Sequence, residues 1–185
     1  MKVYLAGPDV FLPDAKRIGQ LKQDICRQHG LEGLFPVDGS PPGDVGEPLS
    51  RRIFRANTAL MDQADVIIAN LTPFRGPSAD AGTVYELGYM LGKGDRLCLG
   101  YSNSPRSYID KVRDRMKIHA DGSTFRDPDK LEVENFDLPD NLMIVHGLEL
   151  AGHPLVVPTE AVADPLHDLS AFEACVRIAA QHTRG

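Results

Sequence analysis

The residues from Asp65 to Leu71 read Asp-Val-Ile-Ile-Ala-Asn-Leu and form the clearest strand signal in the chain. The run is continuously apolar and rich in β-branched residues, instead of alternating between apolar and polar ones. This pattern is typical of a strand with both faces buried, as in a parallel sheet that helices cover on either side. The chain is therefore expected to build an α/β fold around this strand.

Shorter apolar runs and helical repeats alternate along the rest of the chain. Strands are predicted at 3–6, 34–36, 65–71 and 96–101, and helices at 13–29, 49–63, 80–91 and 169–181. The helix at 80–91 is expected to stop at Gly92 and Gly94. Such alternation implies a doubly wound parallel sheet with flanking helices.

The length of 185 residues suggests a single domain, 1–185. The stretch 102–137 is polar with little periodicity and is expected to be a partly irregular excursion. Loops rich in Gly or Pro are predicted at 38–48, 72–79 and 152–165. Ligands of open parallel sheets bind beyond the carboxyl ends of the strands, where the loops at 7–13 and 72–79 would lie.

Composition excludes several classes of function. The formal net charge of -6 argues against non-specific nucleic-acid binding, which needs clustered Lys and Arg. The six histidines form no metal-binding pattern and no phosphate-binding glycine loop is present, so neither a metal nor a nucleotide-hydrolase site is expected. The three cysteines are expected to be small, buried or semi-buried side chains. No signal peptide and no apolar run of about 20 residues occurs, so a cytoplasmic protein without membrane contact is expected.

The stretch Asp80-Ala-Gly-Thr-Val-Tyr-Glu86-Leu-Gly88 carries the strongest sign of chemistry. Asp80 is placed near the N-cap of a predicted helix, where a carboxylate stabilises free backbone N–H groups. Glu86 follows within two turns among mostly apolar neighbours, and Gly82 and Gly88 leave room for a ligand or another chain. By themselves, these residues do not require a functional site. Asp80 could simply cap the helix, and Glu86 could be an acid on a solvated helix face.

Three polar side chains elsewhere could join this acid. Tyr4 lies on the first predicted strand, where its phenol could orient a carboxylate or simply pack in the core. Asn57 lies toward the end of the helix at 49–63 and could line a pocket or act as a cap. Arg75, in the loop at 72–79, could bind an anion or remain exposed in solvent.

Five stretches occur in an order that is specific when they are taken together. They are Tyr4–Pro8 with Phe11, Ala64–Leu71, Pro73–Gly76, Asp80–Gly88 and Asn141–Met143. This combination resembles the nucleoside 2-deoxyribosyltransferase family over most of residues 1–150. The resemblance implies a flavodoxin-like α/β fold and an enzyme that needs no cofactor.

The resemblance also implies roles for individual residues. Glu86 would attack the anomeric carbon, and Tyr4 would hold that carboxylate. Asp80 and Asn57 would line the pocket for base and sugar, although the position of Asn57 is Asp in some relatives. The other substrate-binding residues expected from the matching motifs are Gly7, Phe11, Phe74, Arg75 and Gly82.

The last matching stretch implies self-association. Asn141 would come from a neighbouring subunit to hold the sugar 5′-hydroxyl, with Met143 close by. A homodimer, or a hexamer of dimers, would therefore build each site from two chains.

The predicted activity is transfer of a 2-deoxyribosyl group between nucleobases through a covalent intermediate on Glu86, with retention at the anomeric carbon. The partners would be a deoxyribonucleoside and a free nucleobase. One alternative is an N-glycoside hydrolase of deoxynucleosides or deoxynucleoside 5′-monophosphates, for which Arg75 and Ser78 could bind the phosphate. A second alternative is a non-catalytic nucleotide-binding domain on the same fold.

Overall fold

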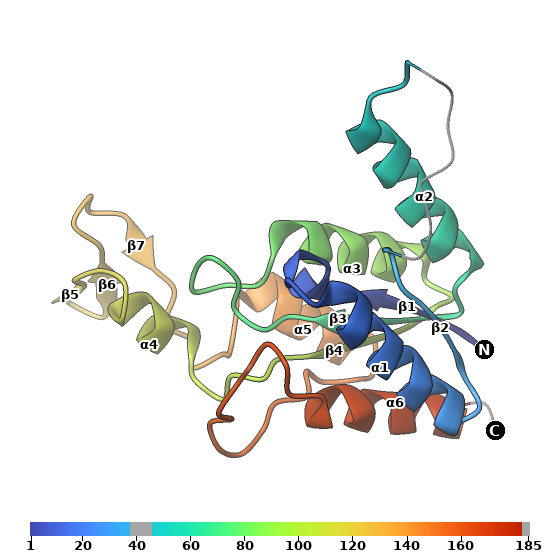
Figure 1. Cartoon of the computed structure of the whole chain (residues 1–185). Helices are drawn as coiled ribbons and strands as arrows, with labels where there is room; N and C mark the ends of the chain where they lie inside the picture. Colours follow the sequence, from blue (N-terminus) through green and yellow to red (C-terminus); the bar gives the residue numbers. More distant parts are fainter. Residues whose placement is uncertain (38–45, 183–185) are drawn as a thin grey trace.

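A four-stranded parallel sheet with the order β2-β1-β3-β4 forms the centre of the computed structural model, which describes residues 1–37 and 46–182 (Figure 1). The strands are β1 (Lys2–Ala6), β2 (Glu32–Leu34), β3 (Val66–Asn70) and β4 (Leu97–Tyr101). Every residue of β3 is buried, as the β-branched run predicted. Tyr101, the last residue of β4, forms an isolated parallel bridge with Val156. The segment around Val156 therefore lies along the outer edge of β4.

Helices cover both faces of this sheet, so the predicted doubly wound α/β architecture is confirmed. The helices are η1 (Pro8–Phe11, a 3₁₀ turn), α1 (Ala15–Gln28), α2 (Leu49–Gln63), α3 (Ala81–Lys93), α4 (Tyr108–Arg113), α5 (Leu142–Leu150) and α6 (Ser170–His182). Helices α1 and α6 lie on one face, and α3 and α5 on the other (Figure 1). Within the described residues, no helix is long and apolar enough to cross a membrane.

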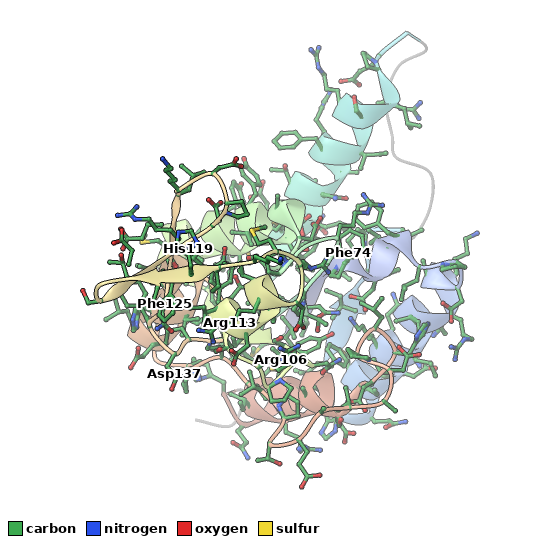
Figure 2. The ribbon with its side chains drawn as sticks, turned by 90° about the vertical axis from the view of Figure 1, so that its left-hand side faces the viewer. Phe74, Arg106, Arg113, His119, Phe125 and Asp137 are labelled. Carbon is green, nitrogen blue, oxygen red and sulfur yellow. The ribbon has the colours of Figure 1, made fainter. Side chains whose placement is uncertain are left out.

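The excursion at 102–137 contains more regular structure than its sequence indicated. It includes α4 and a small antiparallel sheet made of β5 (His119–Asp121), β6 (Thr124–Arg126) and β7 (Glu132–Val133). The Arg113 guanidinium lies 5.2 Å from the centroid of the Phe125 ring and ties α4 to this sheet (Figure 2). Strands of two or three residues are too short to produce a recognisable alternation, which is why the sequence did not reveal them.

Several element boundaries differ from the prediction by one or two residues, and helix α1 begins at Ala15 instead of 13. The second strand is β2 at Glu32–Leu34 instead of 34–36, because it pairs with β1 from Lys2 to Tyr4 and ends there. Helix α3 also continues through Gly92 and ends only at Gly94, which has the left-handed φ of 75° that favours glycine. Most of the loop predicted at 38–48 lies outside the described residues.

Helix α2 has the predicted span, but the sheet does not cover its apolar side chains. Ile53 is 44% exposed and Phe54 is 53% exposed, whereas Met61 near the end of the helix is buried. The first turns of α2 project beyond the sheet (Figure 1), where the Phe54 ring meets the Tyr85 ring of α3 with centroids 6.3 Å apart. The apolar periodicity thus predicted the helix correctly without showing what covers it.

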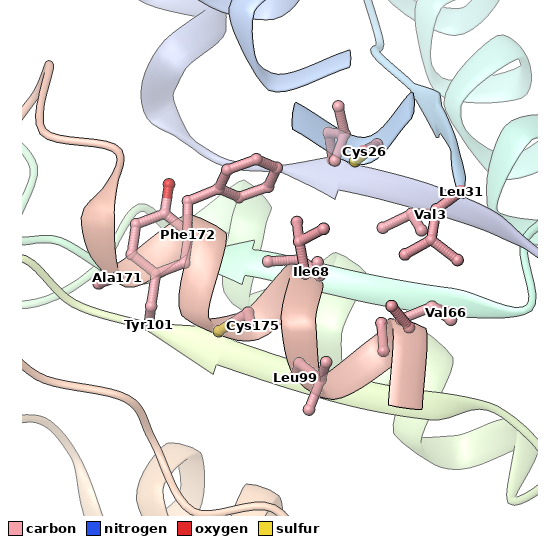
Figure 3. Close-up of a cluster of buried hydrophobic side chains, with 14 of the residues drawn as sticks. Val3, Cys26, Leu31, Val66, Ile68, Leu99, Tyr101, Ala171, Phe172 and Cys175 are labelled. Atoms are coloured by element: carbon pink, nitrogen blue, oxygen red, sulfur yellow. The ribbon is translucent and has the colours of Figure 1, made fainter. Parts of the chain in front are cut away.

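The alternation of side chains along the strands divides the core into two layers. Val3 and Leu5 point toward α1 and α6, in a layer that also contains Cys26 and Cys175 (Figure 3). Cys98 lies in the other layer, and all three cysteines are buried, as predicted. Tyr4 and Ala6 point to the opposite face, into the layer formed with α3 and α5. Since successive strand residues face opposite sides of a sheet, this register directs the Tyr4 phenol toward α3.

Candidate functional site

A cavity of about 410 Å³ opens beyond the carboxyl ends of β1 and β2, between α2 and the start of α3. Its lining residues are Gly7, Val10, Phe11, Pro36, Val37, Ile53, Asn57, Asp80, Gly82, Thr83 and Glu86. The structure therefore brings six of the residues predicted from sequence together around one cavity, with the apolar side chains of Val10, Pro36, Val37 and Ile53. Its place at the sheet edge is the one expected for ligands of a parallel α/β fold.

The Glu86 carboxylate in this wall is held by two side-chain donors. Tyr4 Oη donates a hydrogen bond of 2.7 Å to Glu86 Oε1, and Asn57 Nδ2 lies at 3.5 Å from the same oxygen. Burial raises the pKa of Glu86, and the Asp80 charge raises it further, whereas the bonds from Tyr4 and Asn57 lower it. Burial and the neighbouring carboxylate raise the pKa of Tyr4, so the phenol remains a proton donor to that carboxylate.

Asp80 occupies the N-cap of α3, as its position in the sequence predicted. Its Oδ2 accepts hydrogen bonds from the Thr83 backbone N–H at 3.0 Å and from Thr83 Oγ1 at 3.1 Å. A Cβ at Gly82 would lie 3.0 Å from the same oxygen, so glycine leaves this carboxylate unobstructed. Thr83 was missed from the sequence, although its place midway between Asp80 and Glu86 on one helix face was a usable signal.

Asn57 brings an unsatisfied acceptor to the cavity. Its Oδ1 is buried and has no hydrogen-bond partner among the described residues. Buried polar atoms of native proteins are nearly always paired, so an orphan acceptor in a pocket wall indicates a ligand donor. The amide thus presents its N–H side to Glu86 and its oxygen to whatever the cavity binds.

The turn after β1 is held by a buried polar network. Asp9 Oδ2 lies 2.7 Å from Lys22 Nζ, and Asn70 Nδ2 donates to both oxygens of Asp9 at 3.2 Å. Desolvation lowers the pKa of Lys22, and the Asp9 charge opposes that effect. A Cβ at Gly7 would lie 2.3 Å from Asp9 Oδ2, so only glycine allows this close approach. Nothing in the local sequence pattern of Asp9 or Lys22 indicated this pair.

Phe11, Phe74 and Arg75 form a stack that reaches the cavity through one member only. The rings of Phe11 and Phe74 are parallel within 14° and 5.3 Å apart, and the Arg75 guanidinium lies 5.1 and 4.6 Å from their centroids. Phe11 lines the cavity, whereas Phe74 and Arg75 are not among its lining residues. The stack joins the turn after β1 to the loop after β3.

Asn141 and Met143 do not line the cavity of their own chain. The Asn141 side chain caps α5 by accepting from the Met143 backbone N–H at 3.0 Å, and it donates to Glu134 at 2.9 Å. The Met143 side chain is 74% exposed. Among the described residues, no group of three or more His, Cys, Asp or Glu side chains could hold a metal ion.

The parallel sheet and the cavity at its carboxyl edge, with a half-buried carboxylate and its phenol donor, define an α/β protein with a pocket beyond its strands. A family model described as nucleoside 2-deoxyribosyltransferase matches residues 3–143, and the chain belongs to that family. It is also similar to an uncharacterized protein of Schizosaccharomyces pombe, with 31% identity over 97% of this chain and 91% of the relative.

Two solved structures share the fold. A 2-desoxiribosyltransferase from Leishmania mexicana has a TM-score of 0.68 and 28% identity, over 98% of this chain and 97% of that one. A conserved protein from Enterococcus faecalis V583 has a TM-score of 0.57 and 19% identity, over 99% of this chain and 98% of that one. The second likeness concerns the fold alone.

Proposed function

We propose that this protein transfers a 2-deoxyribosyl group from one nucleobase to another, with Glu86 as the nucleophile. The observation that carries the proposal is the half-buried Glu86 carboxylate, oriented by the Tyr4 hydroxyl in the wall of a cavity of about 410 Å³. Family membership and the Leishmania mexicana 2-desoxiribosyltransferase structure support the same reaction class.

The reaction proceeds by two displacements at the anomeric carbon. A Glu86 oxygen bonds to that carbon as the bond to the base nitrogen breaks. The nitrogen takes the electron pair and a proton, which comes from water or from Asp80 in its protonated form. A second base then attacks from the face that the first one left, releases the Glu86 carboxylate and returns its ring N–H proton to Asp80 or water. Two inversions give net retention of configuration.

The cavity favours a nucleoside over a 5′-monophosphate. Its described wall contains two carboxylates, Asp80 and Glu86, and neither Lys nor Arg. Arg75, the cation that could have served a phosphate, lies against the Phe11 and Phe74 rings instead. A phosphate dianion in this wall would meet like charge without a cation to offset it.

We also propose that a second copy of the chain completes the site. Asn141 and Met143 lie outside the cavity of their own chain, and Met143 is largely exposed. The exposed Ile53 and Phe54 side chains on α2 supply apolar surface next to the cavity for such a partner. Measuring the mass in solution by light scattering tests this, and a monomer at assay concentration would argue against it.

Incubation with deoxyinosine, with and without free adenine, tests the activity. Chromatography should show deoxyadenosine only in the tube with adenine, and Glu86→Ala should abolish it. Equal release of deoxyribose in both tubes would instead indicate a nucleoside hydrolase. Cleavage of deoxyinosine 5′-monophosphate without any reaction of deoxyinosine would overturn both the transfer reaction and the preference for a nucleoside.

A further inference from the structure

Asp140 is a buried carboxylate outside the cavity that binds two segments of the site at once. Its side chain is only 2% exposed. One oxygen accepts hydrogen bonds from the Ser78 hydroxyl and from the Asn141 backbone N–H at 2.8 Å. The other oxygen accepts from the Ala79 backbone N–H at 3.0 Å. The carboxylate thereby joins the end of the loop at 72–79 to the start of α5.

Lys111 supplies the positive charge that accompanies this buried acid. Its Nζ lies 4.0 Å from Asp140 Oδ2 and donates a 2.5 Å hydrogen bond to the Pro139 carbonyl oxygen. The Lys111 side chain is itself buried, so both partners are largely shielded from water. A charge held in this way, with several hydrogen bonds of good geometry, fixes the groups that bind it.

Asp140 binds the backbone of one proposed substrate residue, Asn141, and of Ala79, which is next to another. Ala79 precedes Asp80, the N-cap of α3, whose side chain faces the cavity. Asn141 follows Asp140 and begins α5. The peptide bond between Ala79 and Asp80 is therefore anchored on one side by Asp140 and on the other by the Asp80–Thr83 bonds.

We infer that Asp140 is a positioning residue that holds Asp80 at the cavity. Asp140 does not line the cavity, so it acts on the substrate only through these neighbours. The functional part of this inference rests on the proposed transfer reaction. Its structural part, the constraint on the α3 N-terminus, does not.

Kinetics in a double-mutant cycle test the coupling to Asp80. Asp140→Asn keeps the side-chain shape but replaces one acceptor oxygen by a donor, and it should lower kcat/KM for deoxyinosine by about 10- to 100-fold. In an Asp80→Asn background the same change should have less than a threefold further effect, because the group that it displaces is already removed. Multiplicative losses in the two backgrounds would overturn the inference.

Asp62→Asn is the matched control, because Asp62 also tethers α3. It accepts hydrogen bonds from Tyr89 at 2.7 Å and Lys93 at 2.8 Å, at the opposite end of that helix. This variant should keep kcat/KM within about twofold of the wild type. Ser78→Ala, which removes one of the three bonds to Asp140, replaces Asp140→Asn in the cycle if the latter fails to fold.

Amide hydrogen exchange tests the constraint independently of activity. Asp140→Asn should speed exchange at both Ala79 and Thr83, because loosening the first residue frees the cap that protects the second. Faster exchange at Ala79 alone would overturn the inference, whatever the reaction is. Wild-type protein that neither transfers nor hydrolyses deoxyinosine would overturn the proposed function while leaving this result valid.

Discussion

The Tyr4 hydroxyl donates its hydrogen bond to Glu86 across 82 positions of sequence. Tyr4 belongs to the first strand and Glu86 to the middle of α3, so the packing of α3 against the sheet brings the two side chains together. The bond lowers the pKa of a carboxylate that burial raises. It thus favours the ionised form, which the proposed nucleophile requires.

Removal of that bond should change both the rate and its pH dependence. Tyr4→Phe should lower kcat by about tenfold to a hundredfold, the value of a hydrogen bond of roughly 1.5–3 kcal/mol to a charged group. Because the lost bond lowered the Glu86 pKa, the acidic limb of kcat/KM should move to higher pH. Steady-state rates of base exchange across pH measure both effects, and an acidic limb that stays in place would contradict the assignment.

A second carboxylate beside Glu86 should shift the same limb. Asn57→Asp replaces a donor at 3.5 Å by a like charge, which raises the Glu86 pKa by repulsion and by loss of the bond. The acidic limb should therefore move further up than in Asn57→Ala, which loses only the donor. The two pH profiles, recorded side by side, check this order; equal shifts would show that the added charge does not reach Glu86.

The buried ion pair between Lys22 and Asp9 should be important for stability. Lys22→Met leaves the Asp9 carboxylate buried without its cation and should reduce the free energy of unfolding by about 3–5 kcal/mol. Lys22→Met combined with Asp9→Asn removes both charges and should recover much of that loss. Urea unfolding of the wild type, Lys22→Met and the double variant measures these free energies. A double variant no more stable than Lys22→Met would mean that the unpaired charge is not the cause.

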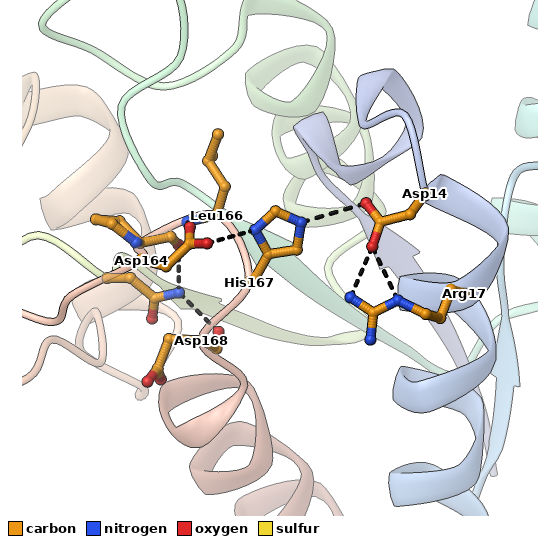
Figure 4. A network of polar contacts seen from close by, with 8 residues as sticks. Asp14, Arg17, Asp164, Leu166, His167 and Asp168 are labelled. Carbon is orange, nitrogen blue, oxygen red and sulfur yellow. Dashed lines mark hydrogen bonds and ion pairs between the residues drawn. The ribbon is translucent and has the colours of Figure 1, made fainter.

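His167 joins α1 to the segment before α6 and should make stability depend on pH. Its Nε2 lies 3.2 Å from Asp14 and its Nδ1 2.8 Å from Asp164 (Figure 4). These carboxylates raise the His167 pKa above 6.5. The stabilisation is therefore complete below the unfolded-state pKa and is lost as pH rises through the folded-state pKa.

The midpoint of thermal unfolding reports this effect. The midpoint of the wild type should lie above that of His167→Gln, and the difference should be larger near about pH 5.5 than near about pH 8.5. Asp164→Asn, which removes one of the two carboxylates, should show an intermediate dependence. A difference between wild type and His167→Gln that stays constant with pH would show that the imidazolium charge does not contribute.

Several local features followed from the sequence alone. The buried β3, the span of α2 and the N-cap at Asp80 depend on periodicity and on side chains within a few residues of one another. The spacing of Asp80 and Glu86 in one motif likewise placed both carboxylates on the same helix. These patterns were also enough to predict the doubly wound arrangement, because alternating strands and helices permit few topologies.

Only the tertiary structure decided what these elements contact. The Tyr4–Glu86 bond and the Lys22–Asp9 pair depend on strand register and on helix packing, which no local pattern encodes. The exposure of the apolar Ile53 on α2 has the same origin, since periodicity specifies a face but not its partner. The sequence by itself therefore determined the fold class and the placing of Asp80 and Glu86 on one helix. The folded chain determined which donors and charges surround those acids, because such contacts arise only when distant segments pack together.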